Sequence, residues 1–164
     1  MFFLFQETVF FYKLDPKTLH RNQLEYAASK RGTAQLGVPL ELSDFKQLHI
    51  DIVVVASVAV NPLTGARIGK GKGYGDLEYG ILSELGCVSK TTMILTTCHE
   101  SQLINDLPSE IMDEHDLPVD IIVTPKRYIY TNCLFARPKR VYWEKISSDM
   151  ISSIPILQQL NKNL

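Results

Sequence analysis

The sequence predicts an α/β domain built on a mainly parallel sheet. Three short runs rich in β-branched residues, at 50–60, 91–97 and 119–125, are typical of strands. Helix-like segments separate these runs, which is the order expected when a crossover helix joins two parallel strands. The chain has 164 residues and shows no repeat, low-complexity tract or linker, so we expect a single domain.

The composition is that of a soluble globular protein. Hydrophobic residues make up 45% of the chain and charged residues 21%, and the net charge of −1 gives no bulk argument for nucleic acid or a membrane. The apolar segment 1–14 lacks a positive start and a cleavage site, so it predicts a buried strand or strand pair rather than a signal peptide or membrane span. Three scattered cysteines without a CxxC pair predict reduced thiols and a cytoplasmic location.

The first half of the chain predicts one helix before the first long strand. Asp15 and Pro16 suit the N-cap and first position of a helix that ends near Gly32. Residues 38–48 read as a connection with a short helical turn. The continuous apolar run at 50–60 predicts a strand that is buried on both faces.

The second half predicts strands and helices in alternation. A turn at 61–67 precedes a helix from Asp76 to Leu85, with Gly86 as its C-cap. Further strands are predicted at 91–97, 119–125, 127–133 and 139–146, and a short helix at 107–116. The chain is predicted to close with a helix at 147–160, capped by Ser147 or Ser148 and kinked or broken by Pro155.

The loop "GARIGKGKGYGD" at 65–76 has the most distinct pattern of candidate functional residues in the sequence. It does not fit the Walker motif, which needs G-x-x-x-x-G-K-[ST]. It does not fit the dinucleotide fingerprint cleanly either, because Tyr74 or Asp76 stands where the third glycine of G-x-G-x-x-G is needed. Its glycines allow backbone N–H groups to converge on an anion, and its cations can neutralise one. Asp76 can cap the helix or hold Mg²⁺ against phosphate oxygens. The candidate phosphate-binding residues are Arg67, Gly69, Lys70, Gly71, Lys72, Gly73 and Tyr74; the alternative is a solvated turn.

Other candidates are less specific. His99 and Glu100 follow a predicted strand, where a site role and a surface hydrogen-bonded pair are both open. His115 and Asp116 precede the next strand, which favours a structural turn. A basic and aromatic cluster can stack on a nucleotide or RNA, although a charged loop between strands is favoured. Its members are Lys126, Arg127, Tyr128, Tyr130, Phe135, Arg137, Lys139 and Arg140.

The glycine-rich loop and its surroundings resemble the 5-formyltetrahydrofolate cyclo-ligase (methenyltetrahydrofolate synthetase) family. "GARIGKGKGYGDLEY" is similar to that family's motif G-x-R-L-G-x-G-G-G-Y-Y-D-R, and "LPSEIMDEHDLPVDIIVTP" to its P-x-x-x-H-D-x-P-x-D-x-x-x-T segment. The sequence is closest to the divergent methenyltetrahydrofolate synthetase domain-containing proteins, which carry "RIGKGxGxxDLEY". The resemblance is best over residues 36–160.

The resemblance implies a three-layer, CoA-transferase-like fold and a phosphoryl-transfer reaction. In the cyclo-ligases, ATP with Mg²⁺ phosphorylates the formyl oxygen of 5-formyltetrahydrofolate, and N10 then closes the ring to give 5,10-methenyltetrahydrofolate. The implied partners are ATP and a reduced folate. Carried over by position, the glycines cradle phosphate, Arg67 neutralises charge, Tyr74 contacts ligand and Asp76 contacts the metal.

The sequence also departs from the motif of the family. Gly75 replaces the second tyrosine, Leu77 replaces the arginine after the aspartate, and Lys72 replaces a glycine. Residues 1–35 resemble only part of the family's N-terminal region, so we expect an N-terminally incomplete chain. Two hypotheses follow: a nucleotide- or RNA-associated domain that does not catalyse ligation, and an active ATP-dependent cyclo-ligase. The resembling divergent proteins often carry an RNA-recognition motif, which is the reason for naming RNA.

Overall fold

The computed structural model describes residues 2–3 and 10–162. The chain divides into two compact units, one of residues 1–46 with 144–164 and the other of residues 47–143. The glycine-rich loop belongs to the unit of residues 47–143.

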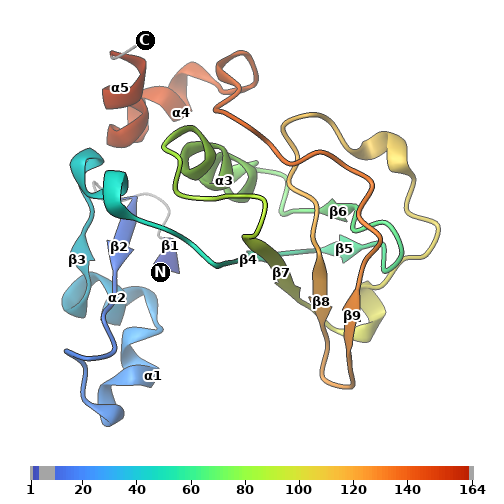
Figure 1. Cartoon of the computed structure of the whole chain (residues 1–164), viewed down its shortest axis with the longest axis horizontal. Helices are drawn as coiled ribbons and strands as arrows, with labels where there is room; N and C mark the ends of the chain where they lie inside the picture. The colour runs from blue at the N-terminus through green and yellow to red at the C-terminus, as the bar shows by residue number, and fades with distance from the viewer. Residues whose placement is uncertain (1, 4–9, 163–164) are drawn as a thin grey trace. The chain divides into compact units, whose positions relative to one another are not determined.

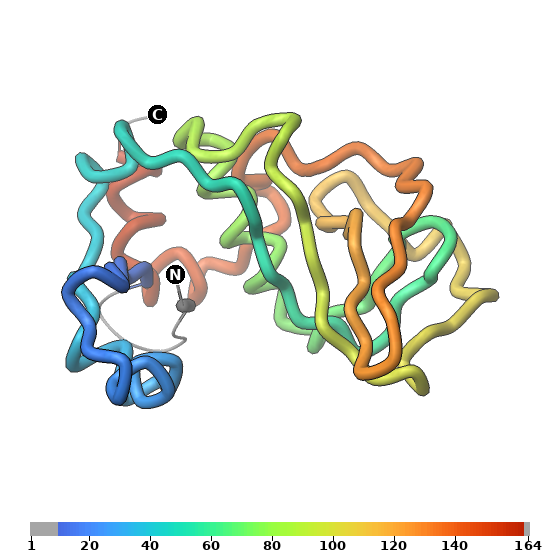
Figure 2. Tube along the Cα trace, turned by 60° about the horizontal axis from the view of Figure 1, so that its bottom comes forward, coloured from blue at the N-terminus to red at the C-terminus, as the bar shows by residue number. Residues whose placement is uncertain are grey.

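A four-stranded sheet forms the centre of the 47–143 unit. Its strand order is β4 (Ile52–Ala56), β7 (Met93–Thr97), β8 (Ile121–Val123) and β9 (Tyr128–Tyr130), as Figure 1 shows. The first three strands are parallel, and β9 returns antiparallel to β8 through a tight turn that is visible in Figure 2. The prediction of a mixed α/β architecture with a mainly parallel sheet is therefore confirmed.

A short hairpin follows β4. Strand β5 (Ala59–Val60) pairs antiparallel with β6 (Arg67–Ile68), and the turn predicted at 61–67 lies between them. Gly65 in this turn has φ 75°, and a Cβ there would lie 2.3 Å from the Val119 carbonyl oxygen. This position therefore needs glycine both for its backbone conformation and for its close approach to another segment.

Helix α3 (Tyr74–Glu84) covers one face of this sheet. Tyr79 of α3 belongs to the same buried cluster as Val53, Val55, Ile94 and Ile122 of the sheet. The helix begins two residues before the predicted start, with Gly73 as its N-cap, so Asp76 lies inside the helix and does not cap it. The residue after its C-cap, Gly86, has φ 72°, as expected of a glycine that ends a helix.

The other face of the sheet is apolar and exposed, which makes the prediction of a doubly buried strand at 50–60 wrong. Ile52 and Val54 of β4 are 55% and 54% exposed, whereas Val53 and Val55 are buried. The physical reason is that α3 is the only α-helix among residues 47–143, all of which are described, and it covers one face. The predicted strand also ends at Ala56, after which the chain leaves for the β5–β6 hairpin.

The first part of the other unit contains a small sheet and short helices. Strands β1 (Phe2–Phe3), β2 (Phe11–Lys13) and β3 (Val38–Pro39) pair antiparallel in that order, which confirms the predicted N-terminal strand pair; residues 1 and 4–9 of that prediction lie outside the described part. The helical segments are η1 (Arg21–Gln23), α1 (Leu24–Ala27), α2 (Lys30–Leu36) and η2 (Leu42–Gln47). The turn predicted within 38–48 is η2.

The single helix predicted from Asp15 to Gly32 is wrong. Residues 15–18 form a turn, in which the Thr18 N–H donates to the Asp15 carbonyl oxygen. The Ser29 hydroxyl then accepts a hydrogen bond from the Gly32 N–H and caps a new helix, α2. Gly32 lies within α2, where a Cβ would clash with the Tyr26 carbonyl oxygen at 1.8 Å, so this glycine permits close packing and does not end the helix.

The C-terminal helix is broken as predicted. Ser147 caps α4 (Ser148–Ser153), and Pro155 opens a second helix, α5 (Pro155–Asn161). The strand predicted at 139–146 is wrong, because the segment contains only the 3-10 turn η5 (Trp143–Lys145). The Val141 N–H donates to Glu84 Oε2 at 2.7 Å instead of to a strand.

Three further findings complete the fold. The 3-10 turns η3 (Glu100–Gln102) and η4 (Ser109–Ile111) follow β7, and η4 replaces the short helix predicted at 107–116. All three cysteines are free thiols, as predicted. Among the described residues, no helix is long and apolar enough to cross a membrane.

Candidate functional site

The glycine-rich loop presents its polar groups to solvent at the start of α3. Lys70, Gly71, Lys72 and Gly73 are all exposed. Gly71 and Gly73 have φ 78° and 65°, and a Cβ at either would meet no atom within 4 Å. The loop therefore needs these glycines for their left-handed backbone, and the space in front of it is open. The N-cap Gly73 has no side chain to hydrogen-bond the first N–H groups of the helix, which favours an anion there.

An ion pair closes the base of this loop. Arg67 precedes the loop and Asp76 follows it, and Arg67 Nη2 donates to Asp76 Oδ1. Only 4% of the Arg67 side chain and 14% of the Asp76 side chain are exposed. The pair joins β6 to the first turn of α3, so it holds the two ends of the loop together.

The remaining donors of Arg67 are also used within the protein. Its Nε donates to the Leu117 carbonyl oxygen at 2.7 Å, and its Nη1 to the Ala56 carbonyl oxygen at 3.1 Å. Asp76 Oδ1 accepts a second hydrogen bond, from the Leu117 N–H at 2.9 Å. The structure thus brings Arg67 and Asp76, from the two ends of the loop, into direct contact. It places Arg67 and Asp76 beneath the loop, and Lys70 and Lys72 on its exposed side.

Glu78 is a buried acid that the sequence reasoning missed. It is 6% exposed, and its Oε1 is buried without a hydrogen-bond partner. Burial, and next the charge of Asp76, raise its pKa from 4.5 to about 8, although Arg67 acts in the opposite direction. The sequence does indicate its burial: Glu78 stands three residues before Ile81 and four before Leu82, so it lies on the apolar face of the predicted helix.

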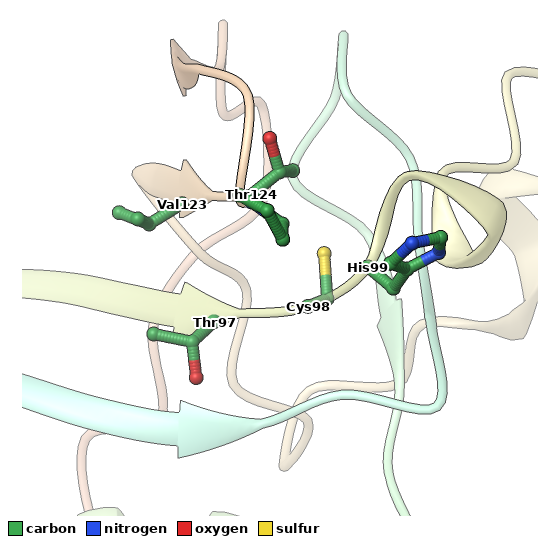
Figure 3. Close-up of a pocket in the computed structure, with 6 residues that line it drawn as sticks. Thr97, Cys98, His99, Val123 and Thr124 are labelled. Atoms are coloured by element: carbon green, nitrogen blue, oxygen red, sulfur yellow. The ribbon is translucent and has the colours of Figure 1, made fainter.

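A shallow pocket of about 370 Å³ lies away from the loop, at the carboxyl ends of β7 and β8 (Figure 3). Thr97, Cys98 and His99 line it from one strand end, and Val123, Thr124 and Pro125 from the other. Figure 3 shows Cys98 Sγ and the Thr124 side chain on the same side of the two strand ends. Burial, and to a smaller extent the charge of Glu100, raises the pKa of the Cys98 thiol, which favours the neutral thiol over the thiolate.

Glu100 links the two loops beside that pocket. The Thr124 hydroxyl donates to Glu100 Oε1 at 2.7 Å, and Arg127 Nη2 donates to Glu100 Oε2 at 3.2 Å. The hydrogen bond from Thr124 is the main cause that lowers the pKa of Glu100; desolvation opposes it, and the charge of Arg127 lowers the pKa further. His99 Nδ1 lies 3.0 Å from the Ser101 hydroxyl and accepts from the Ser101 N–H at the start of η3. His99 and Glu100 therefore both have partners within the protein: His99 in its own turn, and Glu100 in the loop after β8.

The other two clusters predicted from sequence are partly engaged within the protein, although His115 Nδ1 is buried without a hydrogen-bond partner and Lys126 and Lys139 are exposed. His115 lies 3.5 Å from Asp113 and 3.8 Å from Asp116, in the turn before β8. In the basic cluster, Arg127 pairs with Glu100, Arg137 with Asp120 at 2.7 Å, and Arg140 stacks over Tyr142. Tyr128 and Tyr130 remain 69% and 66% exposed. The described residues include no group of three or more His, Cys, Asp or Glu side chains placed to hold a metal ion.

Comparison with known proteins identifies the family. A sequence model of the 5-formyltetrahydrofolate cyclo-ligase family matches residues 11–125. The chain is 42% identical over 145 residues to a human methenyltetrahydrofolate synthase domain-containing protein, covering 88% of this chain and 37% of that protein. The mouse protein of the same name is 39% identical over 147 residues (90% and 38%), and the zebrafish protein is 37% identical over 145 residues (88% and 37%). The chain thus spans less than two fifths of the length of these curated relatives. The chain belongs to the 5-formyltetrahydrofolate cyclo-ligase family.

Proposed function

We propose that this chain is a cyclo-ligase-like domain that binds the phosphate groups of a nucleotide at residues 69–73 and does not by itself complete the ligation. The observation that carries the proposal is the exposed loop with two left-handed glycines, Lys70 and Lys72, in front of an uncapped helix N-terminus. Such a loop offers backbone N–H donors, two ammonium groups and the positive end of the helix dipole to an anion. The family model supports ATP as the nucleotide, because the cyclo-ligases resembled by the loop use it.

The residues fit a phosphate chain better than they fit a resident metal. Mg²⁺ is usually held by one or two carboxylates together with phosphate oxygens. The nearest predicted ligand, Asp76, is paired to Arg67 and also accepts from the Leu117 N–H. If ATP is bound, the loop glycines and lysines hold its phosphates, and ATP supplies the phosphoryl group. Arg67 acts by holding the loop ends and not by contacting phosphate.

The proposal is tested by removing both loop lysines. ATP binding to Lys70→Ala/Lys72→Ala, measured by calorimetry, is expected to be weaker than wild type by at least about tenfold, because each lysine contributes a charge-assisted interaction. The matched control is Lys90→Ala, an exposed lysine of the same unit that lies outside the loop. Equal affinities of the double variant and the wild type would contradict the proposal.

Family membership favours a second candidate, an active cyclo-ligase that forms 5,10-methenyltetrahydrofolate. Purified protein with Mg²⁺, ATP and 5-formyltetrahydrofolate would then gain the absorbance of the methenyl product, and a flat trace at high protein concentration excludes it. RNA association stays a prediction that depends on the exposed lysines and tyrosines of the basic and aromatic cluster, because its arginines have partners within the protein. Those exposed side chains are Lys126, Tyr128, Tyr130 and Lys139. The cytoplasmic location also stays a prediction.

A further inference from the structure

The exposed part of the loop carries its own positive charge. The segment between the two partners of the ion pair, residues 68–75, contains two charged side chains, Lys70 and Lys72. Both are exposed, and Arg67 and Asp76 neutralise each other beneath them. A phosphate that approaches the loop therefore meets two ammonium groups before it meets any carboxylate.

Asp76 is poorly placed to hold a divalent cation above the loop. Its Oδ1 accepts from both Arg67 Nη2 and the Leu117 N–H, so a cation could reach only Oδ2, and just 14% of the side chain is exposed. A divalent cation bound to Asp76 would lie beside the Arg67 guanidinium, and like charges at that range repel strongly in a water-poor site.

We propose that the loop binds nucleotide phosphates without a divalent cation, with Lys70 and Lys72 neutralising the charge that Mg²⁺ neutralises in the usual MgATP complex. This inference rests on the proposed function. In place of the expected metal contact, Asp76 pairs with Arg67 and so holds the two ends of the loop together. Lys72 is the more informative of the two lysines, because it adds a positive charge where the motif that the loop resembles has a glycine.

The test compares ATP binding in Mg²⁺ and in excess EDTA, by calorimetry on the full chain. Free ATP carries more negative charge than MgATP, so affinity in EDTA is expected to equal or exceed affinity in Mg²⁺. A loss of affinity in EDTA beyond about threefold would overturn the inference and leave the proposed function standing. Absence of binding under both conditions would overturn both.

A single variant sharpens the comparison. Lys72→Gly restores the glycine of the motif and removes one ammonium group, so binding in EDTA is expected to weaken by roughly tenfold while binding in Mg²⁺ weakens less. Lys90→Ala is the control and is expected to match the wild type under both conditions. If Lys72→Gly loses affinity equally in Mg²⁺ and EDTA, Lys72 does not take the role of the cation and the inference fails.

Discussion

Replacing Glu78 by glutamine is expected to stabilise the protein above neutral pH and to flatten the pH dependence of its stability. Glu78 is 6% exposed, its Oε1 has no hydrogen-bond partner, and burial is the main cause that raises its pKa to about 8. The folded protein therefore holds a proton on Glu78 that the unfolded chain releases near pH 4.5. Glutamine resembles the protonated acid and cannot ionise.

The sign of the effect follows from proton binding. Between pH 4.5 and about 8 the folded state binds more protons at Glu78 than the unfolded state, so the wild type loses stability as the pH rises through this window. The whole shift corresponds to roughly 5 kcal/mol as an upper limit. Glu78→Gln is thus expected to exceed the wild type by several kcal/mol near pH 9, and to match it within about 1 kcal/mol below pH 5.

Urea unfolding across this pH range, with EDTA present, measures the difference. The control is Glu110→Gln, which removes an exposed carboxylate of the same unit. Parallel stability curves for Glu78→Gln and the wild type would show that Glu78 does not change its protonation on folding.

The second large effect is expected at Arg67. Replacing it by methionine leaves the Asp76 carboxylate nearly buried and without its partner, and leaves the carbonyl oxygens of Leu117 and Ala56 without a donor. Losing one partner of a buried ion pair typically destabilises a protein by 3–5 kcal/mol, and we expect roughly that loss. Lysine is not expected to restore it, because a single ammonium cannot reach three acceptors arranged for a planar guanidinium.

Urea unfolding of three variants separates the ion pair from its surroundings. Arg67→Met/Asp76→Asn is expected to be more stable than Arg67→Met, because the asparagine keeps an acceptor for the Leu117 N–H without a buried charge. Arg137→Met is the matched control, since Arg137 and Asp120 are 24% and 25% exposed. If Arg67→Met loses no more stability than Arg137→Met, Arg67 does not hold the loop as described.

The strands of the main sheet were predictable because β-branched runs mark them, but the burial of their faces was not. In the run at 50–60, valines occupy both faces of β4, so composition alone makes Val54 look as buried as Val55. Only the placement of a single covering helix shows that one face is exposed. The strand predicted at 139–146 failed for a related reason, since Val141 is buried by packing and bonds to the Glu84 side chain.

The loop itself was predictable from its glycines, whereas the roles of its charged residues depend on long-range contacts. Lys70 and Lys72 project from the loop as its local sequence suggests. The partners of Arg67 include Leu117, fifty positions later in the chain, and no local pattern predicts that approach. Glu78 is the opposite case, because its place on the apolar face of the helix was visible in the spacing.

Under the proposed function, residues 69–73 receive the phosphates of a nucleotide. Backbone amide resonances, followed by NMR while ATP is added, test it most directly. We predict that the largest shifts fall on the loop glycines and the first turn of α3, and that Lys70→Ala/Lys72→Ala needs at least about ten times more ATP to reach the same shifts. Unchanged loop resonances, with shifts confined to the pocket at Thr97–His99 and Val123–Pro125, would contradict the account.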